Sequence, residues 1–163
     1  MNPSQDPTVV ASRKLYQVET VRPQVTFRGY YPAMKTIKAA AAVAVSFLVI
    51  DLVWIAFFVG DIYDAQLGDM MRETPSGLAA GVFYVGYIAG IVYFAVRPAF
   101  HEARVGSALL NGALLGALAY GTYTLTNYAI FTNWSFVLVV SDIAWGAFLT
   151  ASSAAIGYLA ARA

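Results

Sequence analysis

Two carboxylates lie inside apolar stretches of this 163-residue chain. Asp51 is followed by Trp54 and Asp142 by Trp145, and both pairs belong to a repeated pattern, D-x-x-W-x-A-F. A carboxylate that faces lipid costs several kcal/mol, so an ionisable residue inside a span normally faces the protein interior and finds a partner there. The repeated pattern therefore predicts a polar site inside the membrane to which both aspartates contribute.

The composition is that of a membrane protein. Hydrophobic residues make up 60% of the chain, charged residues 12%, and the mean hydropathy is +0.63, values too apolar for a soluble domain. We expect the lipid bilayer as the chain's surroundings and no nucleic-acid partner. The net charge of +1 is an average over unlike parts of the chain and gives no information about partners. The absence of cysteine excludes disulfides, thiolate metal ligands and cysteine nucleophiles.

The apolar runs predict an all-α membrane protein, a four-transmembrane antiparallel helix bundle. Each run is long enough to cross a hydrocarbon core of about 30 Å at about 1.5 Å per residue. The predicted spans are 39–59, 77–96, 107–131 and 136–161, which together form a transmembrane domain over 39–163.

The connections between these spans are predicted from turn and cap residues. We expect Gly60 to end the first span and 61–76 to form a loop, with Thr74 and Pro75 starting the next helix. Arg97 and Pro98 are expected to close the second span, and 132–135 to form a tight turn. The polar, basic residues 1–38 are expected to form an N-terminal arm with no cleaved signal peptide.

Orientation follows from lysine and arginine, which are enriched in cytoplasmic flanks. The first loop holds only Arg72 and the third loop none, which predicts four spans with both termini in the cytoplasm. The other basic residues lie in the N-terminal flank, the second loop and the C-terminus: Arg13, Lys14, Arg22, Arg28, Lys35, Lys38, Arg97, Arg104 and Arg162.

Polar side chains from all four spans are expected at one level in the outer half of the membrane. Counted from the predicted span ends, Asp51 lies about 12 Å and Asp142 about 10 Å from the outer surface. Helical spacing places the polar residues of each span on one face of that helix. The predicted intramembrane site consists of Asp51, Trp54, Tyr84, Tyr123, Thr124, Asn127, Asp142 and Trp145.

Small residues predict where helices approach closely. Glycines spaced four apart occur as Gly77/Gly81, Gly86/Gly90 and Gly112/Gly116, a spacing that lets helix backbones meet in membranes. The fourth span carries a further stripe of small residues, namely Gly146, Thr150, Ser153 and Gly157.

Several motifs in the same order resemble a bacterial family of four-span membrane proteins catalogued as domain of unknown function 2177. They are Asp51-x-x-Trp54, Tyr63-x-x-x-Leu67-Gly68, the run 120–129 (YGTYTLTNYA) and Ser141-Asp142-Ile143-Ala144-Trp145-Gly146. The resemblance covers about 38–161 and implies four helices and membrane residence, with no established activity. Relatives usually carry an aspartate where this chain has Thr124, and they generally have a shorter N-terminal arm.

Three interpretations of the aspartate pair remain open. The acids could hydrogen-bond to neighbouring tyrosine, threonine or asparagine side chains and fix helix register. They could bind a cation or share a proton, or act as an acid and base pair on a lipid. Trp54 and Trp145 fit packing better than ligand stacking. No catalytic triad, phosphate loop or zinc spacing is visible.

No cofactor is expected, since His101, the sole histidine, falls in a predicted cytoplasmic loop and haem usually needs an axial histidine. The resemblance to a bacterial family implies a multi-pass protein of the bacterial inner membrane, and the favoured interpretation is a non-catalytic accessory or assembly subunit of a larger bioenergetic complex there. Other membrane proteins would then be contacted through the N-terminal arm and the lipid-facing helices. The alternatives are a small transporter or cation/lipid-binding protein, and a membrane enzyme acting on lipid.

Overall fold

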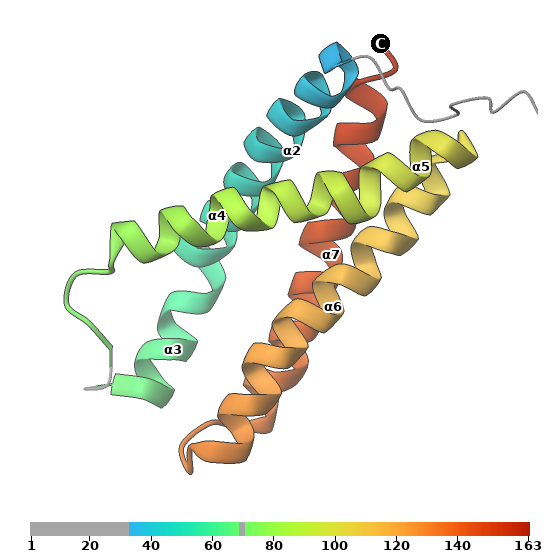
Figure 1. The fold of residues 1–163 in the computed structure, drawn as a ribbon. Coiled ribbons are helices and arrows are strands. Elements are labelled where there is room, and N and C mark those ends of the chain that lie inside the picture. The colour runs from blue at the N-terminus through green and yellow to red at the C-terminus, as the bar shows by residue number, and fades with distance from the viewer. Residues whose placement is uncertain (1–32, 69–70) are drawn as a thin grey trace, which may run out of the picture. The chain divides into compact units, whose positions relative to one another are not determined.

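The computed structural model describes residues 33–68 and 71–163. The described residues form helices with no strand. Four long apolar helical stretches, Ala33–Phe58, Gly77–Glu102, Val105–Ile130 and Phe136–Ala160, are long and apolar enough to cross a membrane (Figure 1). The predicted helical membrane bundle is therefore confirmed. The predicted arm over 1–38 lies outside the described residues up to residue 32.

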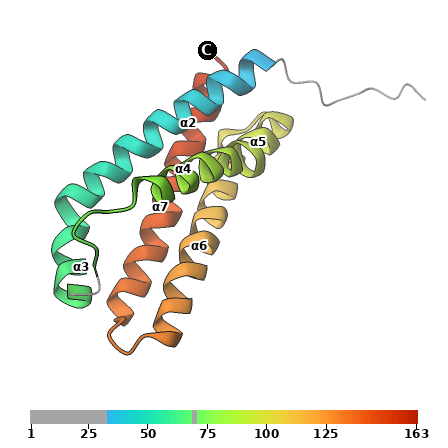
Figure 2. The ribbon, with the colours of Figure 1, turned by 60° about the vertical axis from the view of Figure 1, so that its left-hand side comes forward.

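The first helix continues past Gly60, where the sequence had predicted its end, although the candidate membrane span, Ala33–Phe58, ends close to the predicted boundary. Helix α2 (Ala33–Trp54) continues through a π-helical segment, η2 (Ile55–Val59), into helix α3 (Gly60–Leu67). Gly60 keeps helical dihedral angles, φ −53° and ψ −57°, because a glycine permits a helix end without requiring one. The predicted loop over 61–76 is therefore helical as far as Leu67 (Figure 2).

The second span is longer than predicted. Helix α4 (Gly77–Ile91) runs through a second π-helical segment, η4 (Val92–Val96), into helix α5 (Arg97–Glu102). Pro98 falls in the first turn of α5, where the missing N–H of proline is tolerated. Ala103 ends the helix in the left-handed conformation with φ 54°. His101 therefore lies in a helix and not in the predicted loop.

The start of α4 and the hairpin of the last two helices are set by caps. Ser76, and not Thr74, caps α4 by accepting a hydrogen bond from the N–H of Ala79. Helix α6 (Val105–Ile130) turns back through 131–135 into helix α7 (Phe136–Ala160). Ser135 caps α7 by accepting from the N–H of Leu138, so the predicted tight turn is confirmed.

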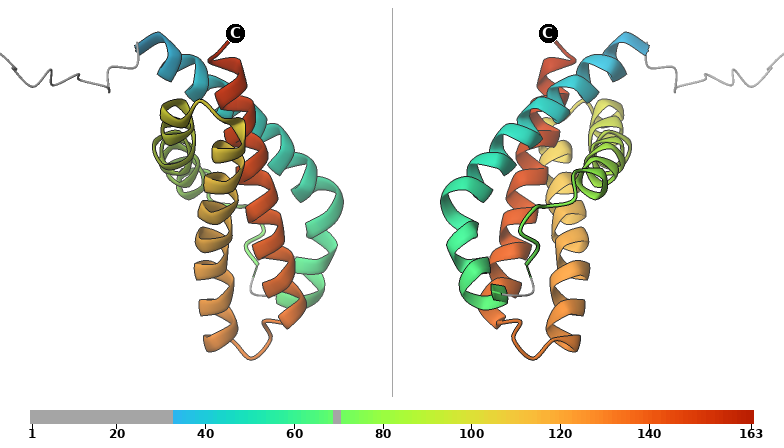
Figure 3. Two further views of the ribbon diagram at one scale, coloured as in Figure 1. Left: turned by 90° about the vertical axis from the view of Figure 1, so that its right-hand side faces the viewer. Right: turned by 90° about the vertical axis from the view of Figure 1, so that its left-hand side faces the viewer.

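Helix α7 is the central helix of the described domain. It lies between α2 and α6 (Figure 2) and packs closely against both, while α4 crosses the other helices at a steep inclination (Figure 3). The main hydrophobic core lies between α2, η4, α5 and α7. A second cluster is built around Trp134, Leu138 and Val139. It packs against three side chains of α3, namely Ile62, Tyr63 and Leu67.

The predicted glycine pairs differ in whether another helix lies close to them. A Cβ placed on Gly116 would lie 2.0 Å from the carbonyl oxygen of Gly146, and one on Gly112 would lie 2.8 Å from the backbone of Ala151. The predicted close approach at Gly112/Gly116 is therefore confirmed for α6 and α7. Cβ atoms placed on Gly77, Gly81, Gly86 and Gly90 would meet nothing within 4 Å. The prediction was wrong for these pairs, because α4 turns them away from its neighbours.

Candidate functional site

Asp51 ends a buried stripe on α2. The stripe consists of Ala39, Val43, Phe47 and Asp51, which are spaced four residues apart and so share one face of the helix. The first three pack in the main core with no exposed surface, and Asp51 retains only 7% exposure. The aspartate thus faces the protein interior, as predicted for an acid inside a span.

Asp142 has the same exposure, 7%, on the buried face of α7. The predicted stripe of small residues continues this face, because Gly146, Thr150, Ser153 and Gly157 are all buried. These small side chains let α2 and α6 pack closely on either side of α7. Close packing brings Asp142 within reach of side chains from α3 and α6.

Two neutral donors hold the carboxylate of Asp51. The hydroxyl of Tyr84 donates to Oδ2 at 2.9 Å, and Nε1 of Trp145 donates to Oδ1 at 3.3 Å. Three helices, α2, α4 and α7, therefore meet at this one side chain.

Asp142 is held from a different direction. The hydroxyl of Tyr63, from α3, lies 3.4 Å from both carboxylate oxygens, and Thr124 of α6 also interacts with the carboxylate. The hydroxyl of Thr124 accepts a hydrogen bond from Nε1 of Trp134 at 3.0 Å. Burial, together with the charge of Asp142, raises the pKa of Tyr63 well above its ordinary value, so Tyr63 stays protonated and can donate.

The two tryptophans of the repeated pattern stack on each other. The ring centroids of Trp54 and Trp145 are 4.2 Å apart and the rings are inclined by 11°. Phe58 stacks on Trp54 at 5.2 Å, and Phe148 packs on Trp145 at 5.7 Å. The two indoles are thus held in place by ring contacts with each other and with Phe58 and Phe148.

The stack corrects the prediction that the two acids lie at one level. Because α2 and α7 are antiparallel, the two acids lie on opposite sides of the stack along the helices. Asp51 lies one helical turn from the stack, toward the C-terminal end of α7. Asp142 lies one helical turn from the stack in the other direction, toward the loop that joins α6 to α7. Three residues on each helix correspond to a separation of about 9 Å along the axes.

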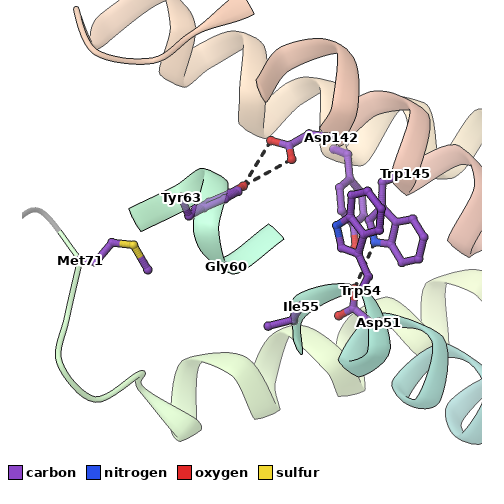
Figure 4. Close-up of a pocket in the computed structure, with 9 residues that line it drawn as sticks. Asp51, Trp54, Ile55, Gly60, Tyr63, Met71, Asp142 and Trp145 are labelled. Atoms are coloured by element: carbon purple, nitrogen blue, oxygen red, sulfur yellow. Dashed lines mark hydrogen bonds between the residues drawn. The ribbon is translucent and has the colours of Figure 1, made fainter. Parts of the chain in front are cut away.

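Both carboxylates nevertheless border one cavity of about 340 Å³. Figure 4 shows Asp142 and Tyr63 on one side of the tryptophan stack and Asp51 on the other. The lining consists of Asp51, Trp54, Ile55, Gly60, Tyr63, Met71, Tyr120, Asp142 and Trp145. Tyr120 lies within electrostatic range of both carboxylates, which places its hydroxyl in the same polar region.

A glycine makes room for Tyr120 in this lining. A Cβ on Gly146 would lie 2.3 Å from Cγ of the Tyr120 ring, a separation at which the ring would have to move. The same glycine that allows α6 to approach α7 therefore admits a cavity-lining phenol.

The predicted site residues fall into three groups. Asp51, Trp54, Asp142 and Trp145 line the cavity. Tyr84 and Thr124 support the carboxylates from behind. Tyr123 is half exposed, packs edge-on against Trp134 and interacts with Tyr63 and Asn127, so Tyr123 and Asn127 lie at the periphery.

Sequence reasoning missed the roles of Tyr63, Tyr120 and Trp134. Tyr63 had been assigned to a loop, because Gly60 was taken as the end of the helix. The sequence did place Tyr120 on one helical face with Thr124 and Asn127, at spacings of four and seven, but Tyr120 was not included in the predicted site. Trp134 gave no signal, because a turn residue inside a second core depends on how α3 folds back.

A family model described as "Predicted membrane protein (DUF2177)" matches residues 36–159. The chain belongs to this family. The match includes both aspartates, both stacked tryptophans and Tyr63, so the cavity of this DUF2177 protein lies within the matched region. No curated protein and no solved structure matches the chain.

The electrostatics of this DUF2177 cavity are one-sided. The lining contains two carboxylates and no lysine or arginine, and the hydrogen bonds to the carboxylates come from neutral groups in the described residues. Neutral donors stabilise an anion only in part, and charges interact strongly where water is scarce. The arrangement therefore favours a positively charged ligand.

The side chains that line the cavity indicate which kind of cation it can hold. Calcium takes six to eight oxygen ligands, and the cavity lining offers two carboxylates and two tyrosines among rings and apolar side chains. Indole and phenol rings, Ile55 and Met71 form most of the remaining wall. Such a wall suits a cation that carries carbon atoms.

Proposed function

We propose that this protein binds an organic ammonium ion in the cavity between Asp51 and Asp142. The observation that carries the proposal is a cavity of about 340 Å³ that two carboxylates border without a described cationic partner. This volume lies near the lower end of the range for small-molecule sites, about 300–1,000 Å³. A bound ammonium would supply the charge that intramembrane carboxylates otherwise lack.

The donors around the carboxylates fit this role. Tyr84 and Trp145 hold Asp51, and Tyr63 and Thr124 hold Asp142. An ammonium ion donates through N–H, so it can use the lone pairs that these donors leave unoccupied. The cavity would therefore be organised before the cation arrives, which limits the entropic cost of binding.

Replacing either acid by its amide tests the proposal. We expect Asp51→Asn and Asp142→Asn each to weaken n-butylammonium binding by about tenfold or more, because each removes one of two negative charges from a poorly hydrated site. Binding is measured by tryptophan fluorescence in phosphatidylcholine nanodiscs, since Trp54 and Trp145 line the cavity.

Asp64→Asn is the matched control, because Asp64 is an exposed acid on α3 outside the cavity lining. Neutral n-butanol serves as the uncharged ligand. Equal affinity of the alcohol and the ammonium, or an equal effect of Asp64→Asn, would contradict the proposal.

The accessory-subunit interpretation remains a separate proposal that depends on the N-terminal arm. Removal of residues 1–31 leaves the described helices intact, since α2 begins at Ala33. If the arm contacts a larger complex, the shortened protein should be lost from that complex on native gels while still inserting in the membrane. Unchanged co-migration with its partners would remove this support.

A further inference from the structure

A second, apolar hollow lies directly beside the polar cavity. It has a volume of about 380 Å³ and is lined by Val49, Ile50, Val53, Trp54, Phe58 and Trp145. We call this hollow the indole groove. Trp54 and Trp145 line both the groove and the cavity, so the tryptophan stack is the shared wall between a charged compartment and an apolar one.

The groove is open on the outer face of α2, which is the face available to lipid. Val49, Val53 and Phe58 are 57%, 48% and 58% exposed. The groove therefore borders the hydrocarbon of the bilayer, whereas the carboxylates behind the shared wall are buried.

The π-helical segment η2 completes the groove. Ile50, Trp54 and Phe58 follow one another at four-residue spacing along the groove. Phe58 belongs to the π-helical segment Ile55–Val59, and its ring stacks on Trp54. Single π-helical turns occur often at functional sites, because they shift the register of side chains.

We propose that the ligand of this site is a single-chain alkylammonium amphiphile, with its ammonium group at the aspartates and its chain in the indole groove. This inference rests on the proposed function for the charged head and adds the chain. Charge complementarity selects the head, and the position of the groove directly beside the cavity, with Trp54 and Trp145 lining both, places the chain. A phospholipid fits less well, because its phosphate would meet a cavity lining without lysine or arginine.

Quenching by a brominated chain tests the position of the tail. In phosphatidylcholine nanodiscs, 11-bromoundecylammonium should quench tryptophan fluorescence more strongly than 11-bromoundecanol, which enters the bilayer without a charged head. Asp51→Asn should abolish this difference. Trp134 lies in the second core cluster, so Trp134→Phe lowers the background signal.

A substitution that fills the groove tests this inference independently of the proposed function. Val53→Phe should weaken undecylammonium binding by about tenfold, since the larger side chain occupies the groove, and should leave n-butylammonium binding unchanged. Leu52→Phe is the matched control, because Leu52 is 58% exposed on the same helix and lies outside the groove lining.

The outcomes distinguish the two proposals. Butylammonium binding with no effect of Val53→Phe on the long chain would overturn the groove and leave the ammonium site standing. Failure of both ammonium ions to bind would overturn both. Displacement of undecylammonium by phosphatidylethanolamine in the nanodisc would show that the occupant is a lipid, and would overturn the single-chain assignment.

Discussion

Replacement of Gly116 by valine is expected to separate α6 from α7 and to destabilise the protein by about 3 kcal/mol, the upper end of the usual cost of overpacking. A Cβ at this position would lie 2.0 Å from the carbonyl oxygen of Gly146. The obstacle is backbone, so no change of side-chain rotamer relieves it. Reversible unfolding in mixed micelles, followed by far-UV circular dichroism, measures the effect.

Gly86→Val is the matched control. Gly86 also lies inside a long apolar helix, and a Cβ there meets nothing within 4 Å. The same change in helix propensity therefore occurs without a clash. Equal destabilisation by the two substitutions would mean that the contact between α6 and α7 does not depend on Gly116.

Removal of both donors from Asp51 is expected to have the second largest effect on stability. The double variant Tyr84→Phe, Trp145→Phe leaves a carboxylate of 7% exposure without its two hydrogen bonds. Interhelical hydrogen bonds in membranes contribute about 1 kcal/mol each, and an unsatisfied charged group adds to this cost. We expect a loss of about 2 kcal/mol in the same unfolding assay.

A double-mutant cycle isolates the carboxylate from the packing change. In an Asp51→Asn background the same two substitutions should lower the free energy of unfolding by less than half as much. The reason is that burying a neutral amide without hydrogen-bond donors costs less than burying a carboxylate without them. Tyr128→Phe serves as the control for loss of a hydroxyl, since Tyr128 is 48% exposed. A cost that stays the same with aspartate and asparagine would assign the effect to lost ring packing.

The hydropathy of the chain was sufficient to predict the four spans, because crossing a membrane constrains length and composition strongly. The burial of Asp51 and Asp142 followed from the cost of placing a charge in lipid. Ser76 and Pro98 show where such reasoning failed. Helix ends depend on small differences between neighbouring cap and turn residues, and several positions near 74–76 and 97–103 satisfied the same rules.

The cavity was predictable only in part. The repeated pattern correctly indicated that the two aspartate and tryptophan pairs belong together. Tyr63 could not be placed, because its contact with Asp142 depends on the π-helical segment that carries α2 into α3. A π-helical turn leaves little trace in one sequence, since it changes the register of the helix without changing its apolar character.

The antiparallel orientation of the two copies of the pattern bears on electrical behaviour. One acid lies above and the other below the tryptophan stack, about 9 Å apart along helices that cross about 30 Å of hydrocarbon. A positive charge that moved between them would traverse about a third of the transmembrane field, and would gain or lose about 0.7 kcal/mol for each 100 mV of membrane potential. If the proposed cation binds there, its distribution between the two acids would depend on the membrane potential.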